Sequence, residues 1–185
     1  MRTLSVYNMV SLDGYIADAG GDMSWAHSTD PEFQAFGQEN ARGGGALLFG
    51  RKTYDMMAAF WPTEAAKASA PVIAERMNAM PKYVFSRTLR EASWGNTTLL
   101  EGDPGAVAKR LKQEDGPDIV VMGSGSIVAQ LTRAGVVDRY TLVINPILLG
   151  GGLSMFRDLE RRTSLKLEKV RTFPNGYVVL WYARA

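Results

Sequence analysis

Short apolar runs alternate along this chain with longer segments in which apolar residues return every three or four positions. A short, wholly apolar run is typical of a strand buried on both faces of a sheet, and the second spacing is typical of a helix with one packed face. The alternation therefore predicts an α/β fold with a mostly parallel sheet. The expected strands are Thr3–Val10, Ala46–Phe49, Tyr83–Phe85, Thr97–Leu100, Asp118–Met122 and Arg139–Asn145.

The helical segments are marked by their termini as well as by their spacing. Asp30 has the residue type of an N-cap, and Pro31 fits the first turn of a helix that ends at glycines 43–45. Further on, Leu165–Phe173 and Tyr177–Tyr182 flank a Pro-Asn-Gly turn, which predicts an antiparallel hairpin and hence a mixed sheet. The other expected helices are Thr53–Phe60, Pro71–Met80, Pro104–Glu114 and a segment from Ser126 that ends at Gly135.

Length and composition fit one globular domain over residues 1–185. The chain is 46% hydrophobic and 22% charged, which excludes a disordered, collagen-like or coiled-coil protein. Its 21 Lys+Arg and 19 Asp+Glu residues are scattered, so neither a nucleic acid nor an anionic membrane is the expected partner. The first residues lack the continuous apolar stretch of a signal peptide, and no window approaches the ~20 apolar residues of a membrane span. We expect a soluble, cytoplasmic protein with a small-molecule partner.

The chain has no cysteine and one histidine, and both facts narrow the chemistry. Without cysteine there is no disulfide, no thiolate nucleophile and no Cys-based metal site. A Ser-His-Asp triad would have to be built on His27, which lies in a polar segment and is expected to be solvated. No metal site is expected, and a reaction carried by a cofactor is favoured.

Three predicted strands end in a small residue that is followed by a helix or a basic side chain. The three segments are Phe49-Gly50-Arg51-Lys52-Thr53, Phe85-Ser86-Arg87 and Met122-Gly123-Ser124-Gly125-Ser126. The carboxyl ends of parallel strands bind ligands, and a helix N-terminus offers free N–H groups to phosphate. Arg51, Lys52 and Arg87 add positive charge. Together the segments predict a ligand with several phosphates; the alternative is that the glycines serve only their turns.

The glycine turn after the Asp118–Met122 strand matches neither of the common nucleotide-binding motifs. A G-x-G-x-x-G fingerprint would need glycine where Val128 stands, and no G-K-[ST] closes a Walker loop.

Several motifs occur in one order along the chain: S-L-D-G-Y-I-A, L-L-F-G-R-K-T-Y, F-W-P, V-F-S-R-T, V-M-G-S-G-S-I and P-I-L-L-G-G-G. The set resembles the dihydrofolate-reductase-like superfamily, in particular the small stand-alone relatives of the reductase domain of riboflavin-biosynthesis deaminase-reductases. The resemblance extends from Leu4 to Tyr182. It implies a single-domain, three-layer α/β fold, NADPH as cofactor, and hydride transfer to a small pteridine-like, folate-like or pyrimidine substrate. By analogy with these relatives it also implies a homodimer.

The resemblance also implies which residues contact the cofactor. The Gly50 segment matches the helix start at the cofactor phosphates, and the Phe85 segment matches the receptor of the adenosine 2′-phosphate. An arginine beside a hydroxyl there favours NADPH over NADH. The matching positions are Met9 and Ile16 at the nicotinamide, Gly50, Arg51, Lys52, Thr53, Phe85, Ser86 and Arg87, the pyrophosphate turn Gly123, Ser124, Gly125, Ser126 and Ile127, and Gly150 and Gly151 in a late loop near the nicotinamide.

The substrate side rests on Met23-Ser24-Trp25, which resembles the M-P-W of folate reductases, where the catalytic aspartate follows at a fixed interval. That interval leads to Asp30, with Glu32 or water as the alternative proton source and helix capping as the alternative role of Asp30. Trp25, Phe33 and Trp61 are expected to contact a flat heterocycle, or else to belong to the core.

The P-I-L-L-G-G-G form departs from true folate reductases and argues against dihydrofolate itself. The chain also lacks the His- and Cys-rich deaminase domain that accompanies riboflavin-type reductases, which bears on reduction of a ribosylated pyrimidine. Two other classes remain open: a non-catalytic NADP(H)-binding sensor on the same fold, and an interaction protein that binds no nucleotide.

Overall fold

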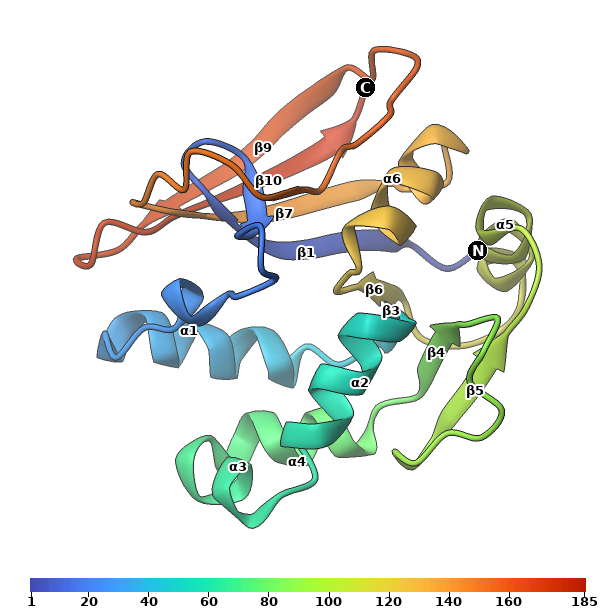
Figure 1. Ribbon diagram of the computed structural model, residues 1–185, viewed down its shortest axis with the longest axis horizontal. Coiled ribbons are helices and arrows are strands. Elements are labelled where there is room, and N and C mark those ends of the chain that lie inside the picture. The colour runs from blue at the N-terminus through green and yellow to red at the C-terminus, as the bar shows by residue number, and fades with distance from the viewer.

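A computed structural model describes residues 1–185 and contains one large sheet that runs through the molecule (Figure 1). The sheet has eight strands in the order β5-β4-β3-β6-β1-β7-β10-β9. Pairing is parallel from β5 to β7 and antiparallel for β10 and β9. The strands are β1 (Leu4–Ser11), β3 (Ala46–Gly50), β4 (Lys82–Phe85), β5 (Thr97–Leu100), β6 (Ile119–Val121), β7 (Arg139–Asn145), β9 (Leu165–Thr172) and β10 (Val178–Arg184). The mixed sheet with its C-terminal hairpin is confirmed.

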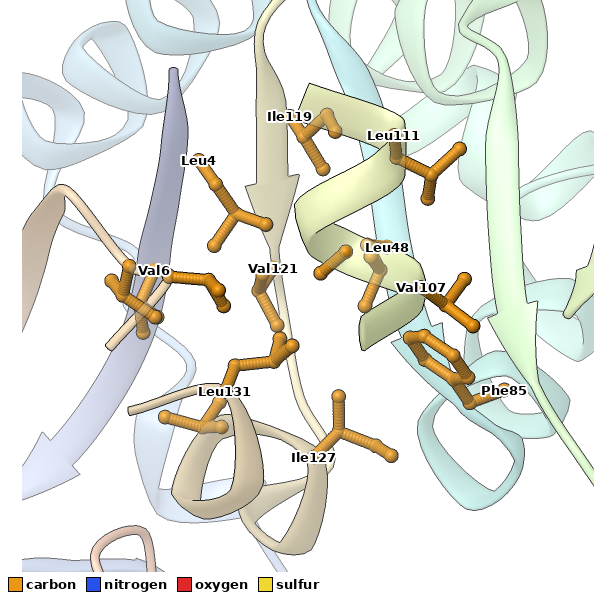
Figure 2. Packing of buried hydrophobic residues seen from close by; sticks show 14 of the residues in the cluster. Leu4, Val6, Leu48, Phe85, Val107, Leu111, Ile119, Val121, Ile127 and Leu131 are labelled. Carbon is orange, nitrogen blue, oxygen red and sulfur yellow. The ribbon is translucent and has the colours of Figure 1, made fainter. Parts of the chain in front are cut away.

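Helices cover both faces of the sheet, which gives the three layers expected. They are α1 (Pro31–Arg42), α2 (Arg51–Phe60), α3 (Glu64–Ser69), α4 (Pro71–Ala79), α5 (Pro104–Gln113) and α6 (Gly125–Arg133). On one face, Val107 of α5 and Leu131 of α6 belong to a buried cluster with Leu48 and Val121 of the sheet (Figure 2). Residues 46–50 of β3 are buried throughout, as a strand covered by helices on both faces requires.

The opposite face holds two smaller clusters. Tyr54 of α2 and Met77 of α4 pack with Phe49 of β3. Next to them, Phe36 of α1 packs on Val143 of β7 and on the C-terminal hairpin. This face is therefore covered by α1, α2 and α4.

Some short elements were not predicted. β2 (Tyr15–Ala17) and β8 (Leu153–Ser154) form a separate two-stranded sheet, and η1 (Ser24–Ala26) is a single 3₁₀ turn. Elements of this length show no periodicity, and β2 and β8 depend on each other across a long stretch of chain. None of the helices is both long and apolar enough to cross a membrane.

Two predicted helix starts lie slightly late. α2 begins at Arg51 rather than Thr53, because Gly50 stays extended and Arg51 and Lys52 form the first turn. In the same way α6 begins at Gly125, one residue before the expected Ser126. Basic or glycine residues in a first turn carry no apolar periodicity, so the pattern alone could not locate these starts.

Candidate active site

The three predicted phosphate-facing segments meet at one edge of the sheet. Gly50 and Phe85 are partners in the parallel β3–β4 ladder. The N–H of Gly50 donates to the carbonyl of Gly123 at 2.8 Å, and that of Ser86 donates to the carbonyl of Leu100 at 3.3 Å. The ends of β3, β4, β5 and β6 are thus held side by side, as the topology rule for parallel sheets predicts.

A cavity of about 680 Å³ opens at these strand ends. All three predicted segments contribute to its lining, and so does the end of β5, which sequence reasoning did not include. The sixteen lining residues are Gly50, Arg51, Lys52, Phe85, Ser86, Arg87, Thr88, Leu100, Glu101, Gly102, Asp103, Pro104, Ser124, Ser126, Ile127 and Gln130. The missed signal was the Leu100–Gly102 strand end, which has the same strand-then-glycine form.

Two helices that start at the cavity have no side-chain cap. The N-cap residues of α2 and α6 are Gly50 and Ser124, both extended, and neither provides a side-chain oxygen that accepts a backbone N–H of the helix. By contrast, Asp30, Thr63 and Asp103 cap α1, α3 and α5 through their side chains. α4 also lacks a side-chain cap, but its N-terminus does not line the cavity. The first N–H groups of α2 and α6 are therefore available to an anion.

Glycine is required where these turns approach each other. A Cβ at Gly50 would overlap the Oγ of Ser124 and lie 2.9 Å from Ile127. Gly123 has φ +117° and is followed by a cis peptide bond. A Cβ at Gly125 would lie 2.9 Å from the side chain of Ile16, so the structure brings Ile16 against the start of α6.

The basic side chains of the cavity are mostly free. Arg51 pairs with Asp55 on the next turn of α2 at 3.0 Å, and both side chains are about half exposed. Lys52 and Arg87 are exposed and form no ion pair. The Ser86 hydroxyl oxygen accepts the N–H groups of Thr88 and Leu89, so its hydrogen remains free to donate to a ligand. The cavity therefore offers positive charge and donors.

Asn8 is a polar residue that the sequence analysis did not single out. It lies in β1 among apolar neighbours and is 8% exposed, and its Nδ2 has no hydrogen-bond partner. Its Oδ1 would be 3.8 Å from a Cβ at Gly123, which places the amide beside the glycine turn. A buried amide without a partner is rare, and an acceptor atom supplied by a ligand at this turn would satisfy it. The signal in the sequence that could have pointed to Asn8 was a polar residue at a position of β1 where the alternation places buried side chains.

The late glycine loop is tied to the turn after β1. The Asp13 carboxylate accepts the Ser11 hydroxyl at 2.6 Å, the Gly150 N–H at 2.7 Å and the Leu149 N–H at 3.0 Å. These hydrogen bonds, that of Ser11 above all, hold the pKa of Asp13 below its usual value. Gly150 is thereby fixed relative to β1, although neither Gly150 nor Gly151 lines the cavity.

The predicted acids lie elsewhere, at the start of α1. The Oδ1 of Asp30 accepts the N–H of Phe33 at 2.8 Å, which confirms its capping role. Glu32 is exposed and forms a 3.4 Å ion pair with Arg171. Neither carboxylate lines the cavity at the strand ends, so a catalytic role for either stays a prediction.

The predicted aromatic contacts have packing roles of their own. The Phe33 ring lies 4.8 Å from that of Tyr177 and 5.2 Å from that of Phe173, centroid to centroid. Trp61 packs edge-on against Phe60 at 5.1 Å, and the indole of half-buried Trp25 donates to the carbonyl of Asp22. The structure does not bring these rings to the large cavity, and substrate contact stays a prediction for all three.

Tyr7 is the other polar group on the α1 side that the sequence analysis did not single out. It lies in β1 next to the Phe36 cluster, together with Met9, which packs against the same cluster. Burial raises the pKa of Tyr7 to about 12, so its phenol stays protonated at neutral pH. Met9 thus lies on the sheet face toward α1, where its predicted nicotinamide contact is not tested.

Comparison with curated proteins gives relatives of similar length. The uncharacterized protein YyaP of Bacillus subtilis (strain 168) is 31% identical over 177 residues, which cover 94% of this chain and 90% of YyaP. The uncharacterized protein YwjB of the same strain is 27% identical over 184 residues, covering 100% of this chain and 99% of YwjB.

Solved structures share the fold. A putative riboflavin biosynthesis protein from Shewanella sp. PV-4 aligns with a TM-score of 0.75 and 26% identity over 99% of both chains. Two structures at 16% identity show the fold alone. One is a pyrimidine reductase-like protein from Corynebacterium diphtheriae NCTC, with a TM-score of 0.67 over 100% of this chain and 92% of that one.

The other is a diaminohydroxyphosphoribosylaminopyrimidine deaminase/5-amino-6-(5-phosphoribosylamino)uracil reductase from Thermotoga maritima, with a TM-score of 0.69 over 100% of this chain and 57% of that one. The family model of the RibD C-terminal domain matches residues 2–179 of the chain. The match supports a reductase enzyme, and it includes all of the large sheet except most of β10. This chain belongs to the RibD C-terminal domain family.

Proposed function

We propose that this protein is an NADPH-dependent reductase that transfers a hydride to a small pyrimidine-like or pteridine-like heterocycle. The observation that carries the proposal is the cavity at the ends of β3, β4, β5 and β6, where two uncapped helix N-termini lie among basic side chains. Such a site suits a ligand with phosphates at several points along its length.

The residues present fit the phosphate-bearing part of the cofactor. The free N–H groups of α2 and α6 would hold the pyrophosphate, with Lys52 close to it. Ser86 and Arg87 would hold the 2′-phosphate, since one donates a hydroxyl hydrogen and the other a planar pair of N–H groups. The buried amide of Asn8 lacks an acceptor beside the same turn. These side chains orient and bind, and the cofactor supplies the hydride.

Reduction of C=N or C=O also needs a proton. Asp30 is the proposed source, with Glu32 or water as the alternative. One Asp30 oxygen is bound to the Phe33 N–H, which leaves the second oxygen for a substrate or a water molecule. The match to the RibD C-terminal domain and the likeness to the putative riboflavin biosynthesis protein support a heterocycle of the kind reduced in riboflavin biosynthesis as the substrate class.

Titration of the protein with NADPH, followed by cofactor fluorescence, tests the proposal. We expect saturable binding in the micromolar range and oxidation of NADPH when a suitable heterocycle is added. Absence of a saturable change up to about 1 mM, the weak end of useful affinity, would overturn cofactor binding.

A non-catalytic NADP(H)-binding sensor is the second candidate, because neither Asp30 nor Glu32 lines the cavity. Asp30 caps the helix and Glu32 is paired with Arg171. A sensor would bind NADPH with the same side chains but would oxidise it with none of the heterocycles in a substrate screen. The same titration followed by absorbance at the NADPH band therefore separates the two functions.

We also propose that the partner of this chain is a second copy of itself, joined through the C-terminal hairpin. β9 is an outermost strand, and its Leu167 and Val170 are 48% and 47% exposed. Leu167 pairs with Tyr182 of β10, and Val170 pairs with Leu180. Because the register shifts between Trp181 and Tyr182, Leu167 and Val170 lie on the same face of the sheet although they are three residues apart. Exposed apolar side chains on an edge strand offer a surface for association.

Light scattering at micromolar concentration tests the homodimer. We expect twice the chain mass for the unaltered protein and a monomer for Val170→Lys. Thr98→Lys, an exposed change on the opposite edge strand β5, is the control and should leave the dimer intact. A monomeric unaltered protein would overturn the proposed association.

A further inference from the structure

The cavity at the strand ends contains an acidic side chain that a site for phosphates does not need. Glu101 directly follows β5 and lines the cavity with Ser86 and Arg87. β4 and β5 run parallel with Phe85 opposite Leu100, and the Ser86 N–H donates to the Leu100 carbonyl at 3.3 Å. Glu101 is therefore the neighbour of Ser86 across the two strand ends.

The two carboxylates of this wall are in different situations. Asp103 accepts the N–H of Ala106 at 2.8 Å and is committed to the N-terminus of α5. Glu101 is exposed and takes part in none of the ion pairs of the chain, including any with Arg87. Its negative charge is therefore available to a ligand held by Ser86 and Arg87.

A carboxylate acts oppositely on the two forms of a ribose 2′ position. It accepts a hydrogen bond from a 2′-hydroxyl, and it repels a 2′-phosphate. Arg87 has the reverse preference, because its guanidinium pairs with phosphate. The two side chains lie on adjacent strand ends and line the same cavity, so both are placed to act on one group of a bound dinucleotide.

We propose that Glu101 is a specificity-determining residue that offsets Arg87 and narrows the preference for NADPH over NADH. The proposal rests on the proposed function, namely that this cavity holds a nicotinamide dinucleotide. For charges about 6 Å apart at an effective dielectric constant of about 40 to 80, removal of one negative charge changes phosphate binding about three- to tenfold.

Two fragments that differ only in the 2′-phosphate isolate this effect: adenosine 2′,5′-bisphosphate and adenosine 5′-monophosphate. Calorimetric titration of both at fixed ionic strength would give their affinity ratio for the unaltered protein and for Glu101→Gln. We expect Glu101→Gln to raise the affinity for the bisphosphate about three- to tenfold without raising that for the monophosphate. The gain should shrink as salt is added.

Glu91→Gln is the matched control, since it removes the same exposed charge from the connection before β5 rather than after it, and Glu91 does not line the cavity. An unchanged ratio in Glu101→Gln, or an equal change in Glu91→Gln, would overturn the role of Glu101 while leaving dinucleotide binding in place. If the unaltered protein bound neither the fragments nor NADPH, the proposed function itself would fall, and the role of Glu101 with it.

Discussion

The cavity at the strand ends and the start of α1 satisfy their polar groups in different ways. At the ends of β3 and β6, α2 and α6 start without side-chain caps, and Lys52 and Arg87 are unpaired. On the α1 side, Asp30 caps its helix and Glu32 is paired with Arg171, while aromatic rings pack around Phe33. The cavity side leaves its donors open to water or to a ligand, whereas the α1 side is satisfied by the protein itself. The cavity side is therefore the stronger candidate for a binding site.

The largest expected effect is at Gly50, where the two uncapped turns touch. Gly50→Ala should lower NADPH affinity at least tenfold and the free energy of unfolding by about 1–3 kcal/mol, because the new methyl group displaces Ser124 and presses on Ile127. Gly95→Ala is the control, since nothing lies near its Cβ position. Equal NADPH affinity in both variants, measured by fluorescence titration, would contradict the close approach as a requirement for binding.

Arg87→Ala tests whether the unpaired charge of this side acts on the ligand. A charge-assisted contact contributes about 1.5–3 kcal/mol, so NADPH affinity should fall about tenfold to a hundredfold while NADH affinity is unchanged. Arg90→Ala, an exposed change in the same connection, should alter neither value. A parallel loss for both dinucleotides would mean that Arg87 does not contact a 2′-phosphate.

Two variants of Asp30, at the start of α1, separate its helix-capping role from the proposed proton transfer. Asp30→Ala should cost about 0.5–2 kcal/mol in chemical denaturation, because the Phe33 N–H loses its acceptor, whereas Asp30→Asn keeps a good cap and should cost little. If Asp30 is the acid, single-turnover hydride transfer in Asp30→Asn should slow and lose its pH dependence. An unaltered rate and pH profile would assign the proton to Glu32 or to water.

The smallest expected effect is a change in how the free energy of unfolding depends on pH. It comes from Lys82, which lies at the end of β4 opposite the cavity. Lys82 is fully buried, and its ammonium donates to the carbonyls of Asn78, Met80 and Gly95. Burial lowers the pKa of Lys82 from 10.5 to about 8. Between these values the unfolded chain binds the proton and the folded chain does not, so this group makes stability rise with pH.

Denaturation at pH 7.5 and 9.5 measures that slope. The rise contributed by Lys82 should be absent from Lys82→Met, whatever the absolute stability of the variant. An identical pH dependence for Lys82→Met and the unaltered protein would show that the Lys82 ammonium does not titrate in this range.

The sequence predicted most of the sheet and the meeting of three phosphate-facing segments, since both follow from local patterns and from the rule that parallel strands end at one edge. It did not predict that Glu101 and Gln130 line the same cavity. Their positions depend on which strand lies beside β4 and on the angle at which α6 leaves the sheet. The local pattern of apolar and polar residues specifies neither of these. Asn8 was missed because alternation predicts an inward position but not an unsatisfied amide there.

The position of β5 at the edge of the sheet has a consequence for how such proteins diverge. β5 pairs with β4 alone, and the exposed Glu101 follows the strand, so its side chain can change without disturbing the strands that hold the glycine turns. If the proposed function holds, substitutions of Glu101 would alter which nucleotide is preferred and leave the buried core in place. Among descendants of one ancestral domain, coenzyme choice can therefore drift faster than architecture.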